Sequence, residues 1–304
     1  VACFGIGCSV QSNAIAGTLK SSFNVPPMIT AVVITVAASV VIIGGIQSIS
    51  KVTEKLVPFM AAFYIAGGLI IIISNAHMLP FAIRAIFVGA FNPSAVGGGV
   101  IGYTIMLAMR NGVSRGVFTN EAGLGSSPIA HATASTDHPT RQGMWGVTEV
   151  FLDTFVVCTI TALVIITSGV LDEGITDASA LVATAFDMHL AIGRYIVSLG
   201  LLLFAFSTIL GWEYYGETSA RYLLGRKISK PYKLLYVIMI FVGCVMNLDL
   251  AWTVANILNG LMAIPNLIGL IGLSGVVVAL EKDFFKDDRK RTSPQEYEHL
   301  LNLK

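Results

Sequence analysis

The chain has 304 residues, of which 55% are hydrophobic and 12% are charged, and its mean hydropathy is +0.77. Soluble domains carry about 25% charged residues, so this composition excludes an ordinary soluble protein and predicts an all-α polytopic membrane protein. The formal net charge is +1, and the charges gather in short loops and at the C-terminal end. We therefore expect a lipid bilayer as the surroundings and no nucleic-acid partner.

Apolar segments separated by polar loops run through most of the chain, and a helix needs about 20 mostly apolar residues to cross the hydrocarbon core. On this rule we expect spans near residues 1–19, 29–47, 57–75, 100–135, 145–169, 190–220, 234–247 and 250–280. The first segment is short and has no initiator Met, so we expect a fragment with one truncated span and about seven complete ones. The predicted domains are a transmembrane domain, 1–281, and a cytoplasmic C-terminal tail, 282–304.

Basic loop residues indicate the orientation, because Lys and Arg favour the cytoplasmic side of a membrane protein. Lys51, Arg141, the loop 221–233 and the tail fall on one side of the expected spans, which we assign to the cytoplasm. The loop at 170–189 has four acidic residues and no Lys or Arg, so it should face outward. Residues 78–98 are too irregular for a lipid-facing span, and we expect a re-entrant or extracellular helical hairpin there.

The segment Gly116–His131 interrupts the fourth expected span with Asn, Glu, Ser, Pro and His residues. At membrane depth such a segment is tolerated where its backbone lines a cavity, and interrupted helices hold substrate and ion sites in transporters. Groups suited to an amino-acid zwitterion or a sodium ion are supplied by Thr119, Asn120, Ser126 and Ser127. Alternatively, Asn120 and Glu121 only cap and satisfy the interrupted helix. Glu121 could also be a proton site.

A second group of candidate residues lies in the expected span at 190–220. Phe204, Thr208 and Trp212 are spaced by four residues, so they project from one helix face and could form a wall of a small pocket. Alternatively, Ser207 and Thr208 donate hydrogen bonds to carbonyls of their own helix, and Trp212 packs against a neighbour.

Several other polar residues lie within the expected spans. Gln11 and Asn13 stand among small residues, where they could reach a ligand or only form interhelical hydrogen bonds. Glu213 and Glu217 lie close to the basic loop. We expect these two carboxylates to pair with Arg221 rather than to bind substrate.

Several motifs together carry a specific family resemblance. The chain resembles the alanine/glycine:cation symporter family, also called sodium:alanine symporters, at Gly116–His131, Asp137–Thr154, Val52–Phe59, Gly211–Glu217 and Gln11-Ser12-Asn13. The resemblance covers nearly the whole chain. It implies a leucine-transporter-type fold of two inverted five-helix repeats, incomplete at the N-terminus because the first broken helix of that fold would precede Val1.

The resemblance also implies a binding site. Carried over by position, it adds Gln11, Phe118, Thr208 and Trp212 to Thr119 and Asn120 as predicted substrate-binding residues. Ser207 and Thr208 stand where related folds place hydroxyl ligands for sodium. The implied function is sodium-coupled symport of alanine or glycine across the cell membrane by alternating access, with sodium as the coupling ion and no cofactor.

Other functional classes fit the sequence less well. It contains no Walker loop and no GxSxG, HExxH or CxxCH motif, so we do not expect an enzyme. A proton-coupled amino-acid transporter of the same fold is the main alternative. A channel would need rings of like residues, and a noncatalytic membrane subunit would leave the intramembrane polar residues without a role. The sequence leaves open the choice between alanine and glycine and the oligomeric state.

Overall fold

The structure is a computed structural model that describes residues 2–91, 100–175 and 178–286, and the regular elements within these ranges are all helices. This outcome follows from the composition, because a helix satisfies its own backbone hydrogen bonds and lipid offers no partners for them. The all-α class predicted from the sequence is confirmed for the described residues.

Five of the described helical stretches are long and apolar enough to cross a membrane. They are α3 (Gly45–Ser74), α10 (Gly193–Leu224), α11 (Ser229–Val245) with the turn before it, α12 (Leu248–Lys286), and the continuous run of α7 (Pro139–Phe151) and α8 (Cys158–Ser168). The other α-helices are α1 (Gln11–Phe23), α2 (Pro27–Ile43), α4 (Leu79–Phe91), α5 (Val100–Asn120), α6 (Ser127–His131) and α9 (Ala178–Asp187). Two segments are π-helical: Phe4–Val10 precedes α1, and Leu152–Val157 joins α7 to α8.

The break between α1 and α2 follows from local sequence. Asn24 takes the left-handed conformation, and the N–H groups of Asn24 and Val25 bond back to carbonyls in the last turn of α1. Such a left-handed residue ends a helix because it redirects the chain. Pro26 then blocks continuation, and Pro27 begins α2 at a position where its missing N–H has no cost.

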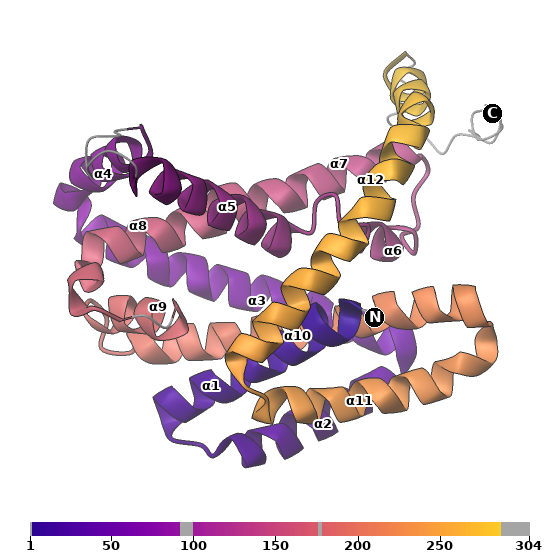
Figure 1. The fold of residues 1–304 in the computed structure, drawn as a ribbon, viewed down its shortest axis with the longest axis horizontal. Helices are drawn as coiled ribbons and strands as arrows, with labels where there is room; N and C mark the ends of the chain where they lie inside the picture. The colour runs from indigo at the N-terminus through magenta and orange to yellow at the C-terminus, as the bar shows by residue number, and fades with distance from the viewer. Residues whose placement is uncertain (1, 92–99, 176–177, 287–304) are drawn as a thin grey trace.

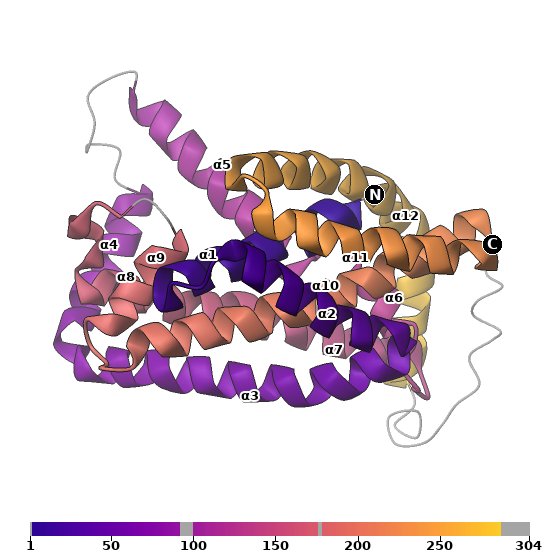
Figure 2. The same ribbon diagram turned by 90° about the horizontal axis from the view of Figure 1, so that it is seen from below.

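Two buried apolar clusters hold the helices together. The larger cluster includes Trp212 and Tyr236 and joins the π-helical segment before α1 to α1, α2, α10 and α11. The smaller cluster surrounds Phe186 and joins α3, α8, α9 and α10. Figures 1 and 2 show α3, α10 and α11 lying along the long axis of the molecule, and Figure 1 shows α12 crossing them obliquely.

The structure moves two of the expected boundaries. α3 begins at Gly45, so the expected loop between spans 29–47 and 57–75 is the first part of a 30-residue helix. The stretch 170–189, expected as an outward loop, contains α9, and its Phe186 is fully buried in contact with its neighbours. We expected a loop because of the acidic residues that flank α9. The helix itself is apolar enough to pack against its neighbours in the interior.

Two predictions fall partly outside the described residues. Of the hairpin expected at 78–98, the structure describes α4 up to Phe91, and residues 92–99 lie outside the described ranges. α12 continues to Lys286, past the expected start of the tail, and residues 287–304 also lie outside them. The division into a domain and a tail therefore stays a prediction.

The loops that the sequence analysis assigns to one side of the membrane lie at one end of the bundle. Lys233 Nζ, at the start of α11, donates a hydrogen bond of 3.0 Å to the carbonyl oxygen of Ile42 at the end of α2. At the same end, the start of α7 meets the end of α12 (Figures 1 and 2). His138 Nε2 lies 3.6 Å from Asp283 Oδ2 there. The helix ends predicted to share one side of the membrane thus lie together.

Candidate functional site

The interrupted helix predicted from the sequence is present. α5 ends at Asn120 and α6 begins at Ser127, and we call residues 121–126 the unwound segment. Within it Glu121, Gly123 and Gly125 have φ values of 55°, 81° and 84°. Glycine adopts this left-handed region without a steric penalty, so the two glycines allow the chain to leave helical geometry here.

Glu121 joins the unwound segment to α10. Its Oε1 accepts a 2.8 Å hydrogen bond from Trp212 Nε1, and its Oε2 accepts a 2.6 Å hydrogen bond from Ser126 Oγ. The Trp212 side chain is 2% exposed. Bonds to a carboxylate are stronger than bonds between neutral groups. The structure thus brings together the two groups of candidate residues through Glu121, which the sequence suggested as a capping residue or a proton site.

Thr119 and Asn120 face a different helix. Thr119 Oγ1 donates a 3.2 Å hydrogen bond to Asp153 Oδ1, and Asn120 Nδ2 donates a 3.1 Å hydrogen bond to Thr154 Oγ1. Both acceptors lie in the π-helical segment Leu152–Val157. Asn120 Oδ1 also accepts from the N–H of Ala122 at 3.0 Å, which is the local capping role that the sequence left open. A π-helical segment places its side chains differently from an α-helix and is frequent at functional sites.

Gln11 and Phe118 lie on two further sides of this region. Gln11 is the half-buried first residue of α1, and its side chain makes no hydrogen bond to the described residues. One turn earlier, a Cβ atom on Gly7 would lie 2.1 Å from Trp212 Cβ, so this backbone packs directly on the indole. The ring of Phe118 packs against Trp252 of α12 with 5.2 Å between ring centroids.

Ser207 and Thr208 make the helix-internal hydrogen bonds that were the alternative to ion binding. Both hydroxyls donate to the carbonyl oxygen of Phe204 at 2.9 Å. A hydroxyl oxygen that donates its hydrogen still has lone pairs to offer a cation. The observed bonds are therefore compatible with a sodium site, and the assignment of sodium to these residues stays a prediction.

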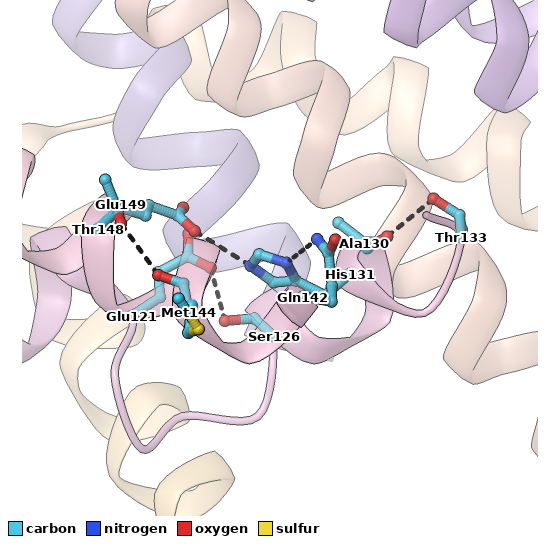
Figure 3. A network of polar contacts seen from close by, with 9 residues as sticks. All are labelled: Glu121, Ser126, Ala130, His131, Thr133, Gln142, Met144, Thr148 and Glu149. Carbon is cyan, nitrogen blue, oxygen red and sulfur yellow. Dashed lines mark hydrogen bonds and ion pairs between the residues drawn. The ribbon is translucent and has the colours of Figure 1, made fainter. Parts of the chain in front are cut away.

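A pocket of about 610 Å³ with a mainly apolar lining lies beside the unwound segment, and among the predicted substrate-binding residues Asn120 alone lines it. It is lined by the unwound segment, by α6 and α7, and by Asn266 and Leu270 of α12. Figure 3 shows His131 between two partners: its Nε2 lies 3.2 Å from Glu149 Oε2, and its Nδ1 lies 2.7 Å from Gln142 Nε2. The same view shows Ser126 held by Glu121.

Electrostatics also order the connection between α6 and α7, which lies outside the membrane-length helices. Arg141 Nε and one of its terminal nitrogens donate hydrogen bonds of 2.6 and 3.0 Å to the two carboxylate oxygens of Asp137. These bonds lower the pKa of Asp137 below its ordinary value, because they favour the ionised form. The pair fixes the start of α7 next to the pocket.

Asn266 is a site residue that the sequence analysis missed. Its Nδ2 donates a 2.9 Å hydrogen bond to the carbonyl oxygen of Gly123 in the unwound segment. The available signal was an asparagine directly after Pro265 within the apolar stretch of α12. No local pattern could have shown which segment this amide contacts.

The expected pairing of Glu213 and Glu217 with Arg221 is wrong. Glu217 instead lies 3.3 Å from Lys233 Nζ and accepts a hydrogen bond from Ser229 Oγ, both of which belong to α11. Glu213 is fully buried, and neither of its carboxylate oxygens has a hydrogen-bond partner among the described residues. Arg221 is exposed, as are Tyr222, Leu223 and Leu224 in the last turn of α10.

A membrane protein whose described elements are all helices, with an interrupted helix that meets a buried indole beside a pocket, has the features of a secondary transporter. Residues 1–298 match the sodium:alanine symporter family, and the chain belongs to that family. This is a family of transporters and not of enzymes.

Three relatives illustrate the range of the family. The chain is 50% identical to the sodium/alanine symporter AgcS of Methanococcus maripaludis, over 93% of this chain and 62% of the relative. It is 35% identical to the amino-acid carrier protein AlsT of Bacillus subtilis, over 94% of this chain and 61% of the relative. It is 34% identical to the probable sodium/glutamine symporter GlnT of the same organism, over 96% and 61%. The chain spans about three fifths of the length of these relatives.

Proposed function

We propose that this protein is a secondary active transporter that couples the movement of small neutral amino acids, alanine or glycine, to sodium by alternating access. The observation that carries the proposal is the contact of Trp212 with Glu121 of the unwound segment, which also lines a pocket of about 610 Å³. The names of the relatives support amino-acid transport, and they include both alanine and glutamine. Substrate size therefore has to be argued from the residues of the proposed substrate site, of which Asn120 lines this pocket.

The proposed substrate site is built around the face of α10 that carries Thr208 and Trp212. Its other members are Gln11, Phe118, Thr119 and Asn120. Glu121 is not a substrate ligand in this proposal, because its carboxylate would repel the carboxylate of an amino acid. Its two hydrogen bonds instead hold the unwound segment against the indole.

The proposed cation site uses the hydroxyl oxygens of Ser207 and Thr208 as two of its ligands. Sodium is a hard cation and prefers oxygen ligands of this kind, which unwound backbone and hydroxyl groups supply in transporters. The remaining features of the proposal are a leucine-transporter-type inverted-repeat architecture, insertion in the cell membrane, and a cytoplasmic C-terminus. The family membership and the interrupted helix support them.

Uptake into proteoliposomes tests this proposal. The intact transporter should accumulate labelled alanine when a sodium gradient is imposed and should fail to do so with a proton gradient alone. Thr208→Ala should raise the half-saturating sodium concentration about tenfold, equivalent to about 1.4 kcal/mol of lost binding free energy. Ser219→Ala is a matched control, because Ser219 also donates to a carbonyl of α10, that of Tyr215, but lies outside the proposed site.

The outcomes separate the parts of the proposal. Uptake driven by a proton gradient without sodium would replace sodium by protons as the coupling ion. An unchanged sodium dependence in Thr208→Ala, with sodium-driven uptake intact, would remove Thr208 from the cation site. Uptake under neither gradient would contradict the proposed transport activity itself.

A further inference from the structure

α12 contacts the unwound segment at one turn, centred on Asn266. Asn266 Nδ2 donates a 2.9 Å hydrogen bond to the carbonyl oxygen of Gly123. A Cβ atom on Gly123 would lie 3.9 Å from Leu267 Cδ2, and one on Gly125 would lie 2.7 Å from Asn266 Oδ1. The two left-handed glycines of the unwound segment thus both pack against the same short stretch of α12.

The hydrogen bond satisfies a group that the break leaves open. In a continuous helix the carbonyl of Gly123 would accept from an N–H four residues later, whereas an unwound backbone loses such partners. Gly123 is half-buried, and a carbonyl taken fully out of water without a partner costs about 1–3 kcal/mol. The Asn266 amide supplies the donor, so the observed course of the unwound segment depends on a side chain that lies 143 residues away in sequence.

The position of Asn266 in α12 also argues against a role in the helix itself. Asparagine is a poorer helix former than leucine, and the surrounding stretch of α12 has a high mean hydropathy of 2.1. Pro265 directly before it lies inside the helix and cannot donate to the carbonyl of Leu261. α12 therefore carries two unfavourable residues at the turn that meets the unwound segment.

We propose that Asn266 is a positioning residue of the substrate site. Its amide holds the carbonyl of Gly123, and through it the unwound segment, in the conformation in which Glu121 accepts the hydrogen bond of Trp212. This inference rests on the transport function proposed above, because it concerns the geometry of the same site. In this proposal the position of α12 affects the conformation of the binding site through Asn266.

The first test follows the environment of Trp212 directly and needs no transport. This sequence has three tryptophans, so Trp145→Phe and Trp252→Phe, with Phe also in place of any tryptophan outside these 304 residues, leave the Trp212 indole as the fluorescent reporter. Asn266→Leu, in the intact transporter with these two changes, should shift the Trp212 emission and increase its quenching by a water-soluble quencher. Asn266→Asp keeps the shape of the side chain and removes the donor, so it should act in the same direction.

Asn259 provides the matched control. It lies two turns earlier on the same face of α12, and its Oδ1 has no hydrogen-bond partner among the described residues. Asn259→Leu should leave both the emission and the quenching of Trp212 unchanged. If Asn266→Leu and Asn266→Asp also leave them unchanged, Asn266 does not position the unwound segment.

The second test is the split between affinity and rate in alanine uptake. Asn266→Leu should raise the KM for alanine about tenfold, which corresponds to about 1.4 kcal/mol, and should change the maximal rate much less. A general loss of folding would instead lower the amount of active protein and hence the maximal rate at unchanged KM, which would contradict the proposal. If the unmodified transporter shows no alanine uptake, the proposed function is wrong. The fluorescence test still decides independently whether Asn266 positions the unwound segment.

Discussion

At the scale of single residues, Trp212 is the most constrained side chain of the site. It is 2% exposed, its Nε1 is bonded to Glu121 at 2.8 Å, and its ring meets Tyr215 edge-on with 5.7 Å between centroids. A buried indole needs a partner for its N–H, and here a carboxylate provides it. The ring is therefore held in place and can act as a rigid wall of the proposed substrate site, although it does not line the 610 Å³ pocket beside the unwound segment.

Trp212→Ala should change the substrate range. Removing the indole opens space, so the variant should accept leucine or methionine, which the wild type should exclude, and should bind alanine more weakly. One added methylene changes affinity in an apolar pocket by about 1–3 kcal/mol, whereas a clash with a fixed ring costs more. Competition against labelled alanine measures this. An unchanged competition profile would mean that Trp212 does not wall the substrate pocket.

Two carboxylates one turn apart on α10 have opposite environments. Glu217 is paired with Lys233 and Ser229, while the fully buried Glu213 has no hydrogen-bond partner among the described residues. Taking a charge out of water is costly unless it is paired and hydrogen-bonded. Removing one partner of a buried pair is therefore far more harmful than neutralising an unpaired group.

Glu213→Gln should consequently be tolerated, whereas Lys233→Met should not. The glutamine keeps the shape of Glu213 without a charge, and we expect the thermal midpoint in detergent to stay the same or rise. Lys233→Met leaves Glu217 buried without its counter-charge and should cost about 3–5 kcal/mol. Thermal unfolding of both variants side by side checks the order. A larger loss in Glu213→Gln than in Lys233→Met would show that Glu213 has a partner that matters.

At the scale of elements, the packing of the π-helical segment Phe4–Val10 on α10 sets the rear of the site. Gly7 leaves room for the Trp212 ring, since its Cβ would lie 2.1 Å from two atoms of that side chain. Gly243 of α11 admits the same segment, because its Cβ would lie 2.8 Å from the Cα of Ser9. Small residues let membrane helices approach closely, and here they bring the segment against the indole.

Gly7→Ala should therefore destabilise the protein, and Gly17→Ala should not. Overpacking of a filled interior costs about 1–3 kcal/mol, and at Gly7 the neighbour is a held indole that cannot move aside. Gly17 of α1 has no atom within 4 Å of its would-be Cβ, and alanine is the better helix former by about 1 kcal/mol. Thermal midpoints and alanine affinity of the two variants provide the measurement. Equal behaviour of both would contradict the close packing on Trp212.

At the scale of the whole molecule, the ends of the helices define two faces. α10 has 32 residues and is about 48 Å long at 1.5 Å per residue, which exceeds a hydrocarbon core of about 30 Å. The C-terminus of α10 lies at the same end of the bundle as Lys233 and His138. The acidic stretch around Asp172 follows the C-terminus of α8, whereas α7 precedes the N-terminus of α8. The molecule is long enough to present these two faces on opposite sides of a bilayer.

Cysteine accessibility should place these faces on opposite sides of the cell membrane. In a background without native cysteines, Lys227→Cys should be protected from an impermeant maleimide in intact cells, and Asp172→Cys should be labelled. The reason is that basic loops favour the cytoplasmic side. After the cells are broken, both should react. Labelling of Lys227→Cys in intact cells would reverse the orientation predicted from the loop charges.

Much of the architecture was predictable because it depends on short-range rules. Helical class and most span positions follow from apolar length, and the break after Asn120 follows from glycines and polar residues that no lipid-facing helix contains. The common face of Thr208 and Trp212 follows from helical spacing alone. The sequence analysis missed α9 because it gave more weight to the flanking acidic residues than to the apolar residues within the helix.

Local sequence determined that this chain forms membrane helices, where one of them breaks, and which polar groups the break exposes. Only the tertiary structure decided what those groups touch. Trp212 and Glu121 are 91 residues apart, and Asn266 and Gly123 are 143 residues apart. Helix propensity and hydropathy act over one or two turns, whereas these hydrogen bonds depend on how α10 and α12 pack around the unwound segment, and many sequence positions could have supplied an equivalent donor.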